Sequence, residues 1–273
     1  MNPSEQIICK PTPWFTLRAV AMLAMFSVFA VLFFIDGTTG YRKKNLEFYV
    51  HATFQKASAT FAKMNEDKTL TAESWKDFAS EQNVDFPEDS SVLPKDLELP
   101  MKWPAVLQDY GKMKELQPHL LWQKYSGENR MSNSPPEHDF DSGKIREQIV
   151  VFYICLGLAL LTLYFLIRTT LRSLRADDEA LTTASGARIP YQDMKSLDLR
   201  KWDTKGIAVV EYDGNSGKGR ARIDGLTYGG FKKDQGEPAE KLMQKIRSNF
   251  SGEIIEYTSI DEPESPSERP ENN

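Results

Sequence analysis

Residues 149–167 read IVVFYICLGLALLTLYFLI, and this stretch decides how the chain is organised. It contains no charged residue, and its most polar side chains are those of Thr162, Cys155 and two tyrosines. A helix rises about 1.5 Å per residue, so the stretch nearly crosses a hydrocarbon layer of about 30 Å. The pattern predicts a transmembrane helix over residues 148–168, with one part of the chain before it and another after it.

A second apolar stretch, residues 19–35, is interrupted only by Ser27. Trp14 precedes this stretch and can lie among lipid headgroups, while Arg18 can extend its charge toward them. The residues that follow, DGTTG, contain no Ala-x-Ala-like cleavage site. We therefore predict an uncleaved transmembrane helix over residues 14–36, and a cleaved signal peptide is the alternative.

Two spans place both chain ends on one side of a membrane. Arg168, Arg172 and Arg175 follow the second span, which favours a cytoplasmic C-terminus because Lys and Arg collect on the cytoplasmic side. Basic residues also flank the opposite ends of both spans, which opposes that orientation. We predict a multi-pass protein of the cell (inner) membrane, with both termini cytoplasmic and residues 37–147 extracytoplasmic. The bilayer is then one partner, and the three arginines can contact anionic headgroups.

The region between the spans, residues 37–147, reads as mainly helical. Apolar residues recur at helical spacing from about residue 44 to 65, after a helix break bracketed by Gly37 and Gly40. Thr71 is a predicted N-cap of a short helix. The many aromatic residues of this region are interpreted as a small helical core, and an aromatic ligand pocket is the alternative.

Prolines divide the second half of the same region. Four of them between residues 86 and 104 predict an extended connector, because each fixes φ and lacks an amide donor. Pro104 fits the first turn of a third helix, and Pro118 is predicted to end it. One more short helical turn and a polar loop then lead back to the second span.

After residue 180 the apolar pattern changes from helical to strand-like. Residues 207–212 form the strongest predicted strand, and residues 213–219 are turn residues that join it to a second strand as a hairpin. This glycine-rich loop is not a phosphate-binding loop, because a glycine and a strand follow Lys218 where Ser or Thr and a helix are required. Pro238 begins a predicted amphipathic helix, and Gly252 is its predicted C-cap.

The order of these elements carries a resemblance. Residues 188–197, RIPYQDMKSL, are followed by the hairpin and the amphipathic helix. Over residues 181–257 the chain resembles a bacterial PH-like domain, an antiparallel β domain closed by a capping helix. The resemblance implies a binding or assembly module rather than an enzyme, and it transfers no lipid-binding residues.

A basic set near the strand ends is one candidate for binding anionic lipid or another membrane protein: Arg200, Lys201, Trp202, Lys205, Lys218, Lys232 and Lys233. An ordinary solvated β surface is the alternative interpretation, because acids are interleaved with this set in the sequence: Asp198, Asp203, Asp213 and Asp234.

Composition excludes several function classes. The formal net charge of −5 argues against nucleic-acid binding, which usually needs a strong basic excess. The two cysteines, Cys9 and Cys155, have no zinc-site or redox spacing. No nucleophile–base set emerges from the three histidines or the paired acids, so we expect no catalysis, metal or cofactor.

The sequence therefore predicts an α+β membrane protein with a non-enzymatic binding or scaffolding role. A transmembrane sensor and an accessory subunit of a transport or secretion complex are the alternatives, and the sequence leaves the oligomeric state open. The predicted divisions are an N-terminal tail (1–13), span 1 (14–36), the inter-span region (37–147), span 2 (148–168), a juxtamembrane linker (169–180), the PH-like domain (181–257) and an acidic tail (258–273) that is predicted to be disordered.

Overall fold

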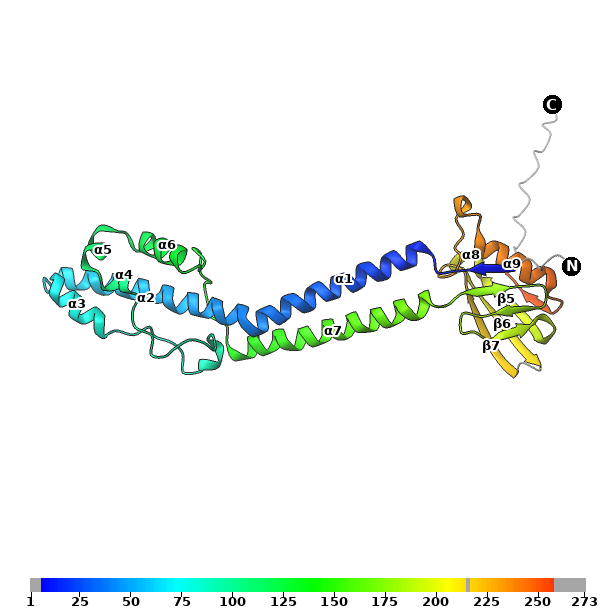
Figure 1. Ribbon diagram of the computed structural model, residues 1–273, viewed down its shortest axis with the longest axis horizontal. Helices are drawn as coiled ribbons and strands as arrows, with labels where there is room; N and C mark the ends of the chain where they lie inside the picture. The colour runs from blue at the N-terminus through cyan, green and yellow to red at the C-terminus, as the bar shows by residue number, and fades with distance from the viewer. Residues whose placement is uncertain (1–5, 215–216, 258–273) are drawn as a thin grey trace, which may run out of the picture. The chain divides into compact units, whose positions relative to one another are not determined.

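The computed structural model describes residues 6–214 and 217–257. Contacts divide the chain into two compact units. The first, here called the β unit, comprises residues 1–23 and 160–273, and the second, the helical unit, comprises residues 24–159. Strands with a covering helix build the β unit, and helices build the other (Figure 1). The chain is therefore α+β with two long apolar helices and C-terminal sheets, as predicted. The acidic tail lies outside the described residues.

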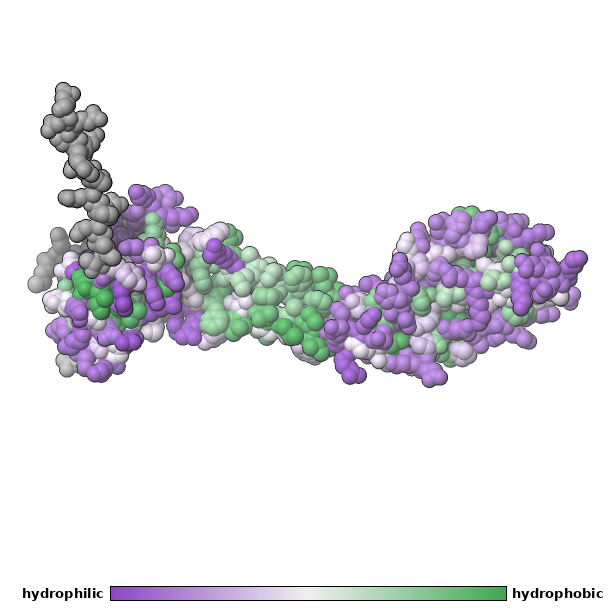
Figure 2. Space-filling view, turned by 180° about the vertical axis from the view of Figure 1, so that it is seen from behind, coloured by the Kyte–Doolittle hydropathy of each residue, from purple (hydrophilic) through white to green (hydrophobic). Residues whose placement is uncertain are grey.

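The two apolar helices are α1 (Pro13–Ile35) and α7 (Ser142–Thr170). Both are long and apolar enough to cross a membrane, and only 6% of the most apolar window of each is buried. Their exposed surface is strongly hydrophobic (Figure 2). Large contiguous apolar surfaces are rare on soluble monomers and mark surfaces that contact a membrane or another protein.

The predicted helix break at Gly37 and Gly40 is wrong. A π-helical segment, η1 (Asp36–Gly40), connects α1 to α2 (Tyr41–Glu66), and no turn interrupts the helix. The glycine at position 37 serves packing, because a Cβ there would lie 2.6 Å from Cδ1 of Ile149. Gly37 therefore marks a close approach to α7 rather than a helix end.

Short helices surround α2 in the helical unit. They are α3 (Ala72–Glu81), the 3-10 turn η2 (Ser90–Val92), α4 (Ala105–Gln108), α5 (Tyr110–Glu115) and α6 (Pro118–Glu128). Thr71 is confirmed as an N-cap, since its side chain accepts from the Ser74 amide. The predicted third helix is two helices, because the Asp109 side chain accepts from the Lys112 amide and starts a new one. Pro118 begins α6 and does not end the preceding helix.

Aromatic side chains form the core of the helical unit, as predicted. Trp75 is fully buried, and its Nε1 donates to the Leu107 carbonyl at 2.9 Å. Its ring centroid lies 4.9 Å from that of Phe61 and 6.3 Å from that of Trp103. Edge-to-face and tilted contacts of this kind stabilise beyond simple burial. These aromatic contacts join the short helices of the helical unit around one hydrophobic core.

The β unit contains two four-stranded sheets. The first has the order β1 (Ile7–Cys9), β2 (Leu174–Ala176), β3 (Ala180–Thr182) and β4 (Arg188–Pro190), all antiparallel. The second has the order β7 (Gly217–Asp224), β6 (Ile207–Gly214), β5 (Met194–Lys201) and β8 (Glu253–Ile255), with β8 parallel to β5. The hairpin of β6 and β7 is confirmed, and its two tip residues lie outside the described residues.

The first sheet extends beyond the domain predicted at residues 181–257. Residues 7–9 belong to the predicted tail, and residues 174–176 belong to the predicted linker, yet both segments are strands of the first sheet. The remaining short elements are η3 (Tyr191–Asp193), α8 (Trp202–Lys205) and η4 (Lys233–Gln235). Strands of the β unit therefore lie both before α1 and directly after α7.

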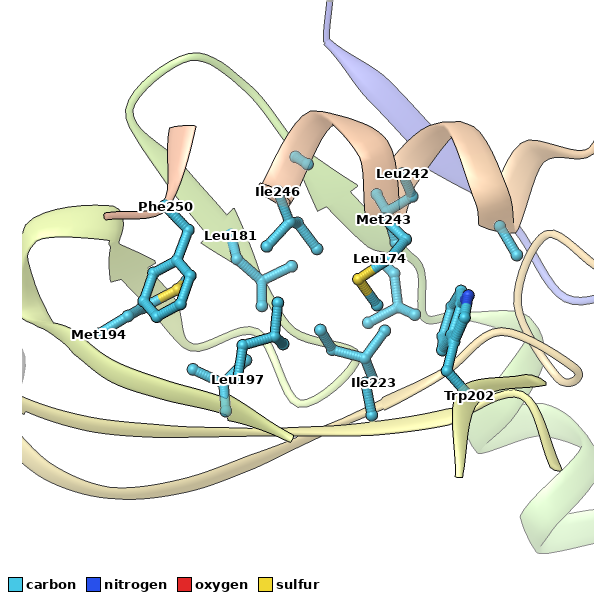
Figure 3. Close-up of a cluster of buried hydrophobic side chains, with 14 of the residues drawn as sticks. Leu174, Leu181, Met194, Leu197, Trp202, Ile223, Leu242, Met243, Ile246 and Phe250 are labelled. Carbon is cyan, nitrogen blue, oxygen red and sulfur yellow. The ribbon is translucent and has the colours of Figure 1, made fainter. Parts of the chain in front are cut away.

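Helix α9 (Pro238–Asn249) covers the core of the β unit. Its buried residues Leu242, Met243 and Ile246 point toward Leu174 and Ile223 (Figure 3). The predicted apolar face of this helix is thus confirmed. The predicted C-cap at Gly252 is wrong, because Phe250 already has extended backbone. Gly252 instead passes close to β5, where a Cβ would lie 2.6 Å from the Lys195 carbonyl oxygen.

Candidate interface of the β unit

The segment before α1 is held by the β unit at several points. Ile7 pairs with Ala176 and Cys9 with Leu174 in the first sheet. The Gly229 amide donates to the Lys10 carbonyl at 2.9 Å. The loop at residues 225–230 therefore extends the contact that β1 makes with β2.

Thr12 joins this segment to α1. Its amide donates to the Thr227 carbonyl at 2.8 Å, and its hydroxyl donates to the Leu226 carbonyl at 3.1 Å. The same hydroxyl accepts from the Phe15 amide at 3.3 Å, as an N-cap does, and Pro13 occupies the first helical position. One residue thus ends the docked segment and starts the helix, so α1 leaves the β unit without a linker.

The same loop meets the end of α7. Tyr228 is buried and forms an isolated β-bridge with Pro11. Burial raises the pKa of Tyr228, and Arg172 and the Thr169 hydroxyl act in the opposite direction. The phenol therefore lies close to the last turn of α7, which precedes β2 by only a few residues. A single loop contacts the chain beside both apolar helices.

This end of the β unit combines exposed apolar side chains with cations. Trp14 is 55% exposed, Leu226 57% and Leu171 82%. The Arg18 guanidinium lies 4.4 Å from the Trp14 ring centroid, a cation–π distance. A pocket of about 130 Å³ opens here, lined by Thr12, Pro13, Trp14, Leu226, Gly230, Phe231, Lys232 and Gln235. We call this end of the β unit the helix-proximal end.

Two residues of the predicted basic set are neutralised within the β unit. Arg200 pairs with Asp198 at 2.7 Å, and Lys218 pairs with Asp213 at 3.1 Å. Hydrogen bonds from Arg200 lower the pKa of Asp198 to about 2, so this carboxylate stays charged. Lys218 also lies six positions along β7 from Asp224, about 20 Å at the usual rise of a strand. The predicted set is therefore not one patch.

Trp202 is a core residue, which corrects its place in the predicted binding set. Only 5% of it is exposed, and its Nε1 donates to Oε2 of Glu240 at 3.1 Å. Its ring centroid lies 5.1 Å from that of Phe231. Figure 3 shows its side chain turned toward the α9 side chains. The lysines beside Trp202 in the sequence favoured a surface binding site, but its side chain points into the core.

The other four lysines of the set lie at the helix-proximal end. Lys201 pairs with Ile207, at the end of β6 that faces Asp224. Lys205 precedes Gly206, whose carbonyl accepts from the Gly225 amide at 2.8 Å. Lys232 lines the pocket beside Trp14, and Lys233 follows it. The structure thus brings together Lys201, Lys205, Lys232 and Lys233 and separates them from Lys218.

The three arginines after the second apolar stretch have different surroundings. Arg168 donates to the Tyr164 hydroxyl at 3.3 Å. Arg172 lies near Tyr228, and Arg175 is in β2, where it donates to the Ser173 hydroxyl at 3.0 Å. Sequence reasoning missed Thr12 and the loop at residues 225–230. The pair Thr12-Pro13 is a helix-start signal, but the loop gives no local signal of its contacts.

Cys9 tests the docking of β1 chemically. Its thiol is fully buried and donates to the Pro238 carbonyl at 3.3 Å, and burial raises its pKa to about 11. The thiolate is the reactive form, so a pKa near 11 instead of 9.0 lowers its fraction at pH 8 about a hundredfold. In a Cys155→Ala variant, we expect iodoacetamide to alkylate the native protein at least a hundredfold more slowly than the urea-unfolded protein. Equal rates would contradict a buried β1.

Comparisons with protein-family models, curated proteins and solved structures found no match to this chain. Within residues 6–214 and 217–257, no group of three or more His, Cys, Asp or Glu side chains is placed to hold a metal ion. The sheets and the covering helix fit the predicted layout, and no family match assigns them to a PH-like domain.

Proposed function

We propose that this chain is a non-enzymatic, multi-pass protein of the bacterial inner membrane whose β unit is a binding or scaffolding module at the membrane surface. One observation carries the proposal. Strand β1, before the first apolar helix, pairs with β2, directly after the second. A folded module that includes the chain on both sides of the apolar pair is fixed where those helices emerge. Both termini lie on the same side in this arrangement, and we assign that side to the cytoplasm.

The helix-proximal end has the composition of a surface that meets lipid headgroups. Trp14 and Leu226 are exposed beside the start of α1, and Lys232 lies with them around one pocket. Tryptophan prefers the headgroup level, and each lysine near an anionic surface contributes about 1 kcal/mol of attraction. Arg168 and Arg172 follow the second apolar stretch and add to the same charge.

The outer face of the second sheet suits a different partner. Arg220 pairs with Glu211 at 2.5 Å across β6 and β7, next to the Lys218–Asp213 pair. These exposed pairs set the acids of β6 opposite the bases of β7, so the face has no uniform positive charge for lipid. Mixed polar charge is common at the rims of protein interfaces. We therefore assign lipid to the helix-proximal end and a protein partner to this sheet face.

A probe at position 226 tests the placement at the membrane. Leu226→Cys, in a Cys9→Ala, Cys155→Ala background, is labelled with an environment-sensitive fluorophore in the full-length protein in nanodiscs. We expect nitroxide-bearing lipids to quench this label at least fivefold more than a label at Ser248→Cys. Ser248 is exposed on α9, ten residues from its first turn and about 15 Å further along the helix. Equal quenching at the two positions would contradict the proposal.

A further inference from the structure

The π-helical segment of the helical unit fixes one arginine in an unusual way. Nη1 of Arg42 donates to the carbonyls of Gly37 at 2.7 Å and Thr38 at 2.8 Å. Its Nε donates to the Ser91 carbonyl at 2.9 Å. These bonds use three of the five guanidinium donors, and Nη2 carries the other two. Three neutral oxygens therefore orient the guanidinium group without cancelling its charge.

Arg42 lines a pocket of about 200 Å³. Arg146 of α7 lines the same pocket, together with Ser91 and Ser142, so two guanidinium groups and two hydroxyl-bearing residues surround it. Ile149 forms another part of the wall and is the first residue of the apolar stretch of α7. The pocket thus lies where the polar part of α7 gives way to its apolar part, the level that lipid headgroups occupy beside a spanning helix.

We propose that this pocket binds the phosphate group of a membrane phospholipid. Arginine is suited to phosphate because its planar donors form directed, charge-assisted hydrogen bonds. π-Helical segments often occur at functional sites, and here two carbonyls of such a segment, those of Gly37 and Thr38, hold Arg42 in place. The proposal goes beyond the function of the β unit and does not depend on it. It requires only that the apolar stretches lie in a bilayer.

A carboxylate nearby sets the charge that the pocket accepts. Asp89 forms hydrogen bonds with the side chains of Ser91 and Ser142, which both line the pocket. Its negative charge therefore reduces the positive potential of the two guanidinium groups. Two guanidinium groups beside one carboxylate suit a singly charged phosphodiester better than a doubly charged phosphate. A phospholipid diester fits that balance, and its acyl chains can follow the apolar surface beyond Ile149.

Lipid binding to the full-length protein tests this site. Native mass spectrometry from detergent would measure the affinity for phosphatidylglycerol, for diacylglycerol and for inorganic phosphate. We expect Arg146→Gln to weaken phosphatidylglycerol binding about tenfold, as the loss of one charge-assisted hydrogen bond does. Lys144→Gln removes the same charge two residues away, outside the pocket lining, and should change the affinity less than twofold. Arg42→Lys keeps the charge but loses the fixed fork, so it should weaken binding by a similar tenfold.

The outcomes separate the sources of the phosphate. Loss of phosphatidylglycerol binding in Arg146→Gln but not in Lys144→Gln supports the proposal. Because Arg146 is exposed and lies on α7 rather than on η1 or α2, this variant remains informative even if Arg42→Lys disturbs folding. Diacylglycerol binding as tight as that of phosphatidylglycerol, or wild-type affinity in both arginine variants, would overturn it. Inorganic phosphate that binds as tightly as the lipid would overturn the assignment to phospholipid.

Discussion

Cys9→Asp is expected to lower the free energy that holds the first sheet closed by about 3–5 kcal/mol, the usual range for an uncompensated buried charge. Cys9 is fully buried between β2 and α9, and its thiol contacts the Pro238 carbonyl. A carboxylate there loses its hydration and meets a carbonyl oxygen that offers it no proton. Ile8→Asp places the same group one residue earlier, where the side chain is 45% exposed, and should cost less than about 1 kcal/mol.

Hydrogen exchange measured by mass spectrometry checks this prediction on the full-length protein. Amides of β2 and β3 should exchange at least about thirtyfold faster in Cys9→Asp than in Ile8→Asp, since the two costs differ by at least about 2 kcal/mol and about 1.4 kcal/mol corresponds to tenfold. The pH dependence of this loss of stability is a second check. Burial raises the pKa of the introduced carboxyl, which is neutral below that pKa, so the loss should shrink as the pH falls toward 4. Wild-type exchange in both variants would show that β1 is not part of the folded unit.

Elements with a strong local pattern were predictable from the sequence. The apolar stretches of α1 and α7 could be predicted from composition and length alone. Helix α9 needed only the spacing of Leu242, Met243 and Ile246, because one helix face buries them together. The capping of α3 by Thr71 also depends on neighbours within three residues. In each case the residues that determine the structure lie beside one another in the chain.

Strand β1 could not be found in this way. It has three residues, and its partner in the sheet is 165 positions away, from Cys9 to Leu174. A strand that short carries no readable alternation, and its stability comes from β2 and α9 rather than from itself. The division of the third predicted helix at Asp109 was hidden for a related reason. One side-chain hydrogen bond to the Lys112 amide decides it, and many aspartates do not form one.

The candidate site was predictable only in part. Basic residues were recognisable by type, but their grouping depended on strand register. Register brings Lys201 to the helix-proximal end and carries Lys218 to the opposite end of the hairpin. It also places Glu211 opposite Arg220, which neutralises both. The sequence also did not reveal which way a side chain points at a turn. Trp202 points inward, where its indole N–H donates a hydrogen bond to Glu240 of α9.

Asn45→Ala is expected to destabilise the helical unit by about 3 kcal/mol, because several buried polar groups lose their partner at once. Asn45 is fully buried on α2. Its Nδ2 donates to the carbonyls of Val92 at 2.9 Å and Phe140 at 2.8 Å, and its Oδ1 accepts from the Phe140 amide at 2.7 Å. One amide side chain therefore fixes two loop segments to α2, and alanine replaces none of these bonds.

Two further variants separate these hydrogen bonds from the properties of the helix itself. Asn65→Ala changes an exposed asparagine near the end of the same helix and should cost less than about 0.5 kcal/mol. Asn45→Asp keeps the shape and the acceptor but removes both donors, so it should destabilise nearly as much as alanine does. Exchange of α2 amides in the full-length protein should therefore accelerate about a hundredfold in both Asn45 variants. If Asn45→Asp exchanged like the wild type, the two carbonyl bonds would not hold the loops, and burial of the amide alone would have to explain the alanine effect.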